Sequence, residues 1–138
     1  MIDPENIPYV AENELLARFI VYSDEKRPDG TVKHKLFLPY KLVELSVNRH
    51  REASLRETWQ VGFDVAEERQ RTLYGLANIR ADRCRIDTLD VAPAPILPKN
   101  PNHANITGYP PAKEDQMALA KQLAATIEGK WQEPPQRT

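Results

Sequence analysis

His103 has the most versatile chemistry of any side chain in this sequence of 138 residues. An imidazole titrates near neutral pH and can serve as an acid, a base or a metal ligand. The other histidines, His34 and His50, show no workable metal-ligand spacing with it. His103 is therefore a candidate catalytic acid or base, and the alternative is that its ring hydrogen-bonds the backbone of a loop.

Arg49 is the second candidate catalytic residue. It ends an apolar run and stands five residues before a predicted helix start, a position where guanidinium groups and helix amides often bind anions. Ser46 lies on the same run and could be a nucleophile only beside an organised base. No glycine-rich loop accompanies them, so a nucleotide cradle is not expected. The alternative for Arg49 and His50 is an exposed charged turn.

Several polar residues beside these candidates could contact a ligand or a partner protein. The segment Asn100–Pro110 surrounds His103 and is bounded by prolines. The candidate binding residues are His50, Asn100, Asn102, Asn105 and Tyr109. The asparagines have a second interpretation as turn residues, because Asn tolerates left-handed backbone and hydrogen-bonds its own chain.

Composition restricts the class of protein. Nineteen basic and 20 acidic residues leave a net charge of −1, which argues against a nucleic-acid surface. Cys84 is the single cysteine, so neither an intramolecular disulfide nor a cysteine-based zinc site can form. The acidic N-terminus lacks an apolar run and no stretch approaches a membrane span. We expect a soluble, cytoplasmic protein with no metal and no cofactor.

Periodicity and turn residues predict the strands. Alternating or β-branched runs favour strands at 15–22, 32–38, 42–47, 73–81, 84–91 and 103–107. A Pro-Asp-Gly turn at 28–30 would join the first two as a hairpin. Residues 92–101 carry four prolines, so this segment is expected to run extended along the surface, outside the sheet.

Two helices should pack on this sheet. Ser54 and Glu57 have the spacing of a capping box, and the apolar stripe that follows predicts a helix over about 54–69. A second stripe predicts a helix over about 112–128, with Gly129 as its stop. The expected fold is a single α+β domain at 13–129 with a mixed or mostly antiparallel sheet of about five or six strands. Residues 1–12 would be an irregular lead-in and 130–138 a flexible tail, with Trp131 as a possible anchor.

Two short segments carry a resemblance to a known group of proteins. Leu45-Ser46-Val47-Asn48-Arg49 and Asn100–Pro110 look like a pattern in small uncharacterised bacterial proteins of similar length, over residues 15–127. The resemblance carries no activity. It implies only that Ser46, Arg49 and His103 belong to one surface.

These observations leave two functional hypotheses. The first is a non-enzymatic interaction or accessory module whose loops at 48–51 and 100–110 meet a partner protein or a second copy of the chain. The second is a small enzyme or binding protein for a phosphate- or carboxylate-bearing ligand, with Arg49 holding the charge and His103 as acid or base.

Overall fold

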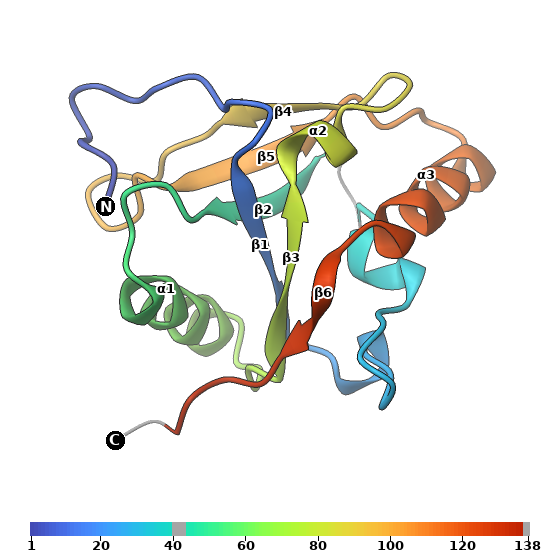
Figure 1. The fold of residues 1–138 in the computed structure, drawn as a ribbon, viewed down its shortest axis with the longest axis horizontal. Helices are drawn as coiled ribbons and strands as arrows, with labels where there is room; N and C mark the ends of the chain where they lie inside the picture. The colour runs from blue at the N-terminus through green and yellow to red at the C-terminus, as the bar shows by residue number, and fades with distance from the viewer. Residues whose placement is uncertain (40–43, 137–138) are drawn as a thin grey trace.

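One antiparallel sheet organises the chain in the computed structural model, which describes residues 1–39 and 44–136 (Figure 1). Within these residues the sheet has six strands in the order β4-β5-β2-β1-β3-β6. The strands are β1 (Leu15–Ile20), β2 (Leu45–Arg49), β3 (Gly75–Arg80), β4 (Asp90–Pro93), β5 (His103–Thr107) and β6 (Glu128–Gln132). The helices are α1 (Leu55–Glu68), α2 (Ala81–Cys84) and α3 (Lys113–Ala125), with 3-10 turns η1 (Ser23–Glu25) and η2 (His34–Phe37). The predicted α+β class, with one sheet and two long helices, is confirmed.

Helix α1 begins at the predicted capping box. The Ser54 hydroxyl accepts a hydrogen bond from the Glu57 amide at 3.1 Å, and the Glu57 carboxylate accepts one from the Ser54 amide at 2.9 Å. The helix then buries Trp59 and Ala66 against Phe19 of β1. Gly62 allows this close approach, because a Cβ there would lie 2.7 Å from the Phe19 ring.

Strands β2 and β3 run parallel to each other, although they are not neighbours. Both pair with β1 in the antiparallel sense, so β1 lies between them and α1 connects them. Strand β2, helix α1 and strand β3 thus make up a parallel β-α-β unit. The unit is present in split form, with one strand inserted.

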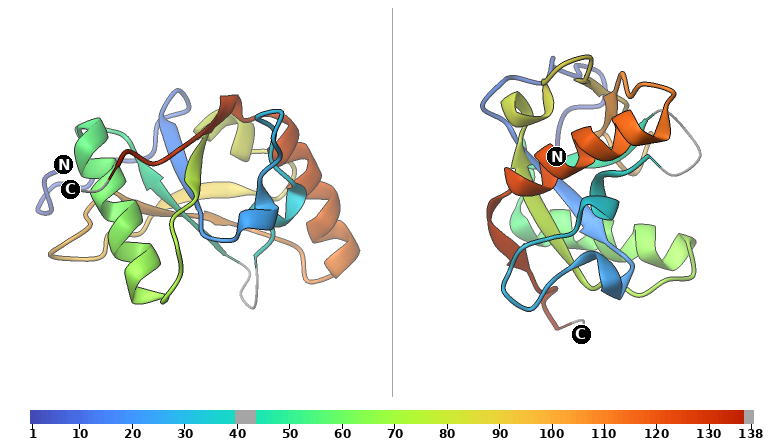
Figure 2. Two further views of the ribbon diagram at one scale, coloured as in Figure 1. Left: turned by 90° about the horizontal axis from the view of Figure 1, so that it is seen from below. Right: turned by 90° about the vertical axis from the view of Figure 1, so that its right-hand side faces the viewer.

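The two faces of the sheet are covered unequally. Successive side chains of a strand point to opposite faces. Leu16 and Ile20 of β1 face the larger core cluster, which η2 and α3 cover. Ala17 and Phe19 face the smaller cluster under α1, to which no described residue of β2, β4 or β5 contributes. Figure 2 shows α1 and α3 on opposite sides of the sheet, and the β2–β5 part of the α1 side is left open.

Strands β1 and β2 diverge after a short contact. β1 pairs with β3 at each residue from Leu15 to Ile20, but with β2 only at Leu16 and Ala17. The two strands spread apart beyond this contact, as Figure 1 shows. The divergence separates the sheet into two groups of three strands, β4-β5-β2 and β1-β3-β6.

Two predicted strands have a different structure. Residues 34–37 of the predicted strand 32–38 form η2, where the adjacent residues Leu36 and Phe37 are both fully buried beneath α3. An alternating strand would bury only one of them on that side. The first residue of the predicted strand 84–91 ends the helical turn α2, and β4 begins only at Asp90. The part of the predicted strand 42–47 at 42–43 lies outside the described residues.

The proline-rich segment and the predicted tail also differ from expectation. Pro93 is part of β4 and stands opposite Ala104. A strand at the edge of a sheet tolerates proline because its outward side needs no partner. Residues 128–132 form β6, which pairs with β3 and takes in the start of the expected tail. Trp131 is indeed an anchor, since its indole nitrogen donates to the Arg27 carbonyl at 2.7 Å.

Candidate functional site

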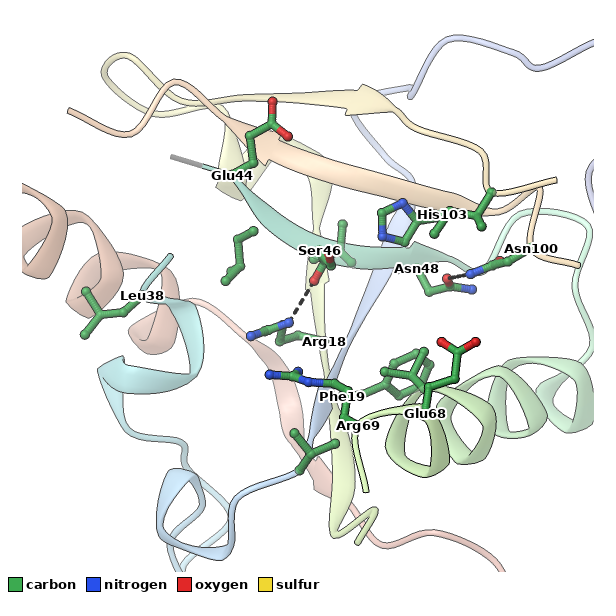
Figure 3. Close-up of a pocket in the computed structure, with 15 residues that line it drawn as sticks. Arg18, Phe19, Leu38, Glu44, Ser46, Asn48, Glu68, Arg69, Asn100 and His103 are labelled. Atoms are coloured by element: carbon green, nitrogen blue, oxygen red, sulfur yellow. Dashed lines mark hydrogen bonds between the residues drawn. The ribbon is translucent and has the colours of Figure 1, made fainter. Parts of the chain in front are cut away.

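The open part of the α1-side face forms a groove of about 450 Å³. Ser46 and Asn48 of β2 and His103 of β5 line one wall (Figure 3). Glu68 and Arg69 at the end of α1 line the other. The groove exists because α1 covers the β1–β3 side of this face and leaves β2 and β5 uncovered.

The strand register brings two of the predicted candidates together. Asn48 stands directly opposite His103 in the β2–β5 pair, and Ser46 stands opposite Asn105. Residues two apart on a strand share a face, so Ser46, Asn48 and His103 all face the groove. The implied common surface of Ser46 and His103 is therefore present.

Arg49 does not belong to this surface, which corrects its predicted role as an anion clamp. It is fully buried, and its guanidinium forms a two-pronged ion pair with the Glu14 carboxylate at 2.8 and 2.7 Å. It also donates to the carbonyls of Pro8 and Tyr9. Strand alternation places Arg49 on the face opposite Asn48. Its hydrogen bonds fix the N-terminal segment, and its guanidinium is not open to a ligand.

Burial of Glu14 by itself would raise the pKa of this carboxyl. The hydrogen bonds from the Arg49 guanidinium and the Ala11 amide, together with the charges of Arg49 and Arg51, outweigh burial and lower the pKa below its usual range. The carboxylate therefore stays charged at neutral pH, as its buried cationic partner requires.

His103 offers the groove a hydrogen-bond acceptor. Its Nδ1 lies 2.8 Å from the Ala94 carbonyl, which can only accept, so Nδ1 carries the proton. Burial lowers the pKa of His103, and the bond to Ala94 opposes this in part. The ring is therefore neutral at pH 7 and Nε2 carries the lone pair, with no hydrogen-bond partner among the described residues. The backbone hydrogen bond considered as the alternative role is present.

Asn102 and Tyr109 are structural residues. Asn102 is fully buried, accepts from the Ile2 amide and donates to the carbonyls of Arg49 and Arg51. The Tyr109 hydroxyl donates to the Phe37 carbonyl at 2.8 Å, and burial raises the pKa of this phenol. Their side chains point into the fold, so neither one is open to a partner.

His50 and Asn105 make polar contacts at the margins of the groove face. The His50 ring lies 2.7 Å from the Asn78 side-chain oxygen, and the Asn105 amide donates to the Glu44 carboxylate at 3.1 Å. Neither residue is among those that line the groove. Asn100 does line it, and its amide donates to the Asn48 side-chain oxygen at 2.8 Å.

Arg18 and Arg69 supply the positive charge of the groove, and sequence reasoning missed both. The Arg18 side chain lies in the gap between the diverging strands and donates to the carbonyls of Leu36 at 2.9 Å and Ser46 at 3.0 Å (Figure 3). Burial lowers the pKa of Arg18, with Glu25 opposing and Arg69 adding to the effect. A charged residue at a core-facing position of an apolar strand was the available signal for Arg18.

A second hollow of about 490 Å³ adjoins the groove and shares Arg18 and Arg69 with it. Its other charged lining residues are Lys35, Lys113 and Glu25. Burial raises the pKa of Glu25, while the Arg18 charge opposes this. Together the two hollows are lined by four basic side chains, Arg18, Arg69, Lys35 and Lys113, and by three acidic ones, Glu25, Glu44 and Glu68.

The described part of the chain offers neither a metal-binding cluster nor a reactive thiol. It contains no group of three or more His, Cys, Asp or Glu side chains that could hold a metal ion. Cys84 is buried, and burial raises the pKa of its thiol to about 12, so it is not a nucleophile at neutral pH. None of the described helices is long and apolar enough to cross a membrane.

The chain matches no protein-family model, no curated protein and no solved structure. The resemblance to small uncharacterised bacterial proteins remains a prediction. The geometry of the groove is therefore the basis for a functional assignment.

Proposed function

We propose that this protein binds a small organic anion in the groove, with Arg18 and Arg69 supplying the positive charge. One observation carries the proposal. Burial lowers the pKa of Arg18, the charge of Glu25 opposes this, and the two guanidinium groups are close enough for the charge of Arg69 to add to the lowering. Neither arginine forms an ion pair with a described carboxylate. Two neighbouring cations repel each other, and a bound carboxylate or phosphate removes this repulsion.

Arg18 is also held ready for a ligand. Its Nε and Nη1 donate to two backbone carbonyls, which fixes the plane of the guanidinium between the strands. A guanidinium has five N–H donors. The N–H donors of Arg18 that do not bond to the Leu36 and Ser46 carbonyls remain for a ligand. Because the guanidinium is already ordered, binding costs little conformational entropy.

The shape of the groove favours a small ligand. Its apolar walls, which include Phe19, Leu38 and Val65, surround a few polar groups, as is usual for small-molecule sites. The groove is lined by two arginines, Arg18 and Arg69, and by two glutamates, Glu44 and Glu68, and the whole chain has a net charge of −1. A long polyanion such as nucleic acid needs an extended basic surface.

The interaction module predicted from the loops at 48–51 and 100–110 has weaker support. Arg49, Asn102 and Tyr109 in these loops are buried and hydrogen-bonded within the fold. These three side chains are therefore engaged inside the molecule, and anion binding is the function that the geometry favours.

Titration calorimetry with hexanoate, citrate and inorganic phosphate tests the proposal. At least one of these anions should bind, and Arg69→Gln should weaken that binding about tenfold or more, since hydrogen bonds to charged groups contribute about 1.5–3 kcal/mol. Arg56→Gln is the matched control, because Arg56 is exposed in the first turn of α1 and does not line the groove. Absence of binding by all three anions, or equal losses in both variants, contradicts the proposal.

A further inference from the structure

A pair of carboxamides at one end of the groove has unmet hydrogen-bonding capacity. The Asn100 amide donates to the Asn48 side-chain oxygen at 2.8 Å (Figure 3). The remaining polar atoms, Asn48 Nδ2 and Asn100 Oδ1, are buried and have no partner among the described residues. The two residues are only 2% and 8% exposed, and both line the groove.

Unsatisfied atoms of this kind are costly. Each buried donor or acceptor without a partner costs about 1–3 kcal/mol, and native proteins contain few of them. Exchanging the nitrogen and oxygen of both Asn48 and Asn100 still leaves one donor and one acceptor. The pair therefore calls for a group that both accepts and donates.

Two further polar side chains, His103 and Ser46, lie beside the carboxamide pair. His103 stands opposite Asn48 in the sheet, and its Nε2 is a second acceptor. Ser46 lies two residues before Asn48 on the same face, which places the two about 7 Å apart along the strand. Arg18 donates to the Ser46 carbonyl, so the carboxamide pair lies about 7 Å along the groove from the end that holds Arg18.

We infer that the ligand of this groove is an organic acid that also carries a carboxamide-type edge, with an N–H and a C=O side by side, about 7 Å from its acid group. The acid group binds Arg18 and Arg69, and the edge completes the hydrogen bonding of Asn48 and Asn100. Primary amides and lactams present such an edge, whereas an ordinary trans amide points its N–H and C=O in opposite directions. This inference rests on the proposed anion site.

Two matched probes test the inference without any change to the protein. Adipamate has a carboxylate and a primary carboxamide separated by four methylenes, and 6-oxoheptanoate replaces the NH₂ with a methyl group of similar size. Adipamate should bind about tenfold more tightly, since one hydrogen bond contributes about 1 kcal/mol or more and 1.4 kcal/mol is a factor of ten. Calorimetry or an NMR titration measures both affinities.

The double variant Asn48→Leu/Asn100→Leu provides the second measurement. Replacing both partners of a polar pair with apolar groups can be neutral or stabilising, so the melting temperature should hold or rise. The preference for adipamate over 6-oxoheptanoate should disappear. A purely structural pair would instead lower the melting temperature and leave the preference unchanged, which overturns the inference.

The outcomes separate the two proposals. Equal affinities of the wild-type protein for both probes, with both reduced by Arg69→Gln, retain the anion site and overturn the carboxamide inference. This is also the result if a water molecule satisfies Asn48 and Asn100. If neither probe binds, the carboxamide inference fails, and the anions tested above decide separately on the anion site. If the double variant does not fold, the comparison of the two probes on the wild-type protein decides.

Discussion

Replacing Glu14 with glutamine should remove a large part of the stability of this protein. The substitution keeps the size of the side chain but leaves the Arg49 guanidinium buried without a counter-charge, where it now has hydrogen bonds of 2.8 and 2.7 Å to Glu14. Removing one partner of a buried ion pair costs about 3–5 kcal/mol. At about 3 °C per kcal/mol for a chain of this size, the melting temperature should fall by about 10–15 °C.

Urea unfolding of the wild type and of Glu14→Gln measures this change, and Arg51→Gln is the matched control. Arg51 lies 3.6 Å from the same carboxylate but is 41% exposed, so its loss should cost less than about 1 kcal/mol. The double variant Glu14→Leu/Arg49→Met should recover part of the loss, because it removes the uncompensated charge. If Glu14→Gln costs no more than Arg51→Gln, the energetic role assigned to this pair is refuted.

The same pair determines how stability depends on pH. The pKa of Glu14 is lower in the folded protein than its ordinary value of 4.5. A carboxyl with a lowered pKa stabilises the fold above its unfolded pKa, and this contribution is lost as pH falls through the folded value. The stability difference between the wild type and Glu14→Gln should therefore be constant near neutral pH and narrow as the pH falls below about 4.5. A stability difference between the two proteins that increases as the pH falls would contradict the lowered pKa of Glu14.

Two further substitutions test contacts inside the fold. Asn102→Ala should cost about 2–4 kcal/mol in urea unfolding, because it leaves the buried Ile2 amide and two backbone carbonyls without their partner. Gly108→Ala should cost more than Gly129→Ala, since both glycines have positive φ but only at Gly108 would a Cβ lie 2.1 Å from the Thr88 carbonyl oxygen. Equal losses at the two glycines would show that backbone strain alone is responsible.

Local signals in the sequence predicted some elements well. The capping box at Ser54 and Glu57 and the apolar stripe after it locate α1, because both depend on residues three or four positions apart. η2 could not be recognised in this way. Its buried residues Leu36 and Phe37 take their positions from packing against α3, which lies far away in the chain. β6 likewise depends on its pairing with β3.

The site was only partly predictable for a similar reason. Ser46 and His103 were correctly expected on one surface, but Arg49 was assigned to it although strand alternation puts neighbouring residues on opposite faces. The part played by Arg18 depends on the divergence of β1 and β2. No local pattern encodes that divergence.

The narrow contact between β1 and β2 also has a consequence for the rate of folding. One group of three strands contains β1, β3 and β6, and the other contains β2, β4 and β5, so the chain passes repeatedly between them. Neither group is a continuous segment, and closing the first requires Leu15 to meet Arg80. Long loops must therefore be ordered before their contacts can form, which slows folding. We expect this protein to fold in milliseconds to seconds, on the time scale of sheet proteins with distant strand pairs rather than that of helical bundles.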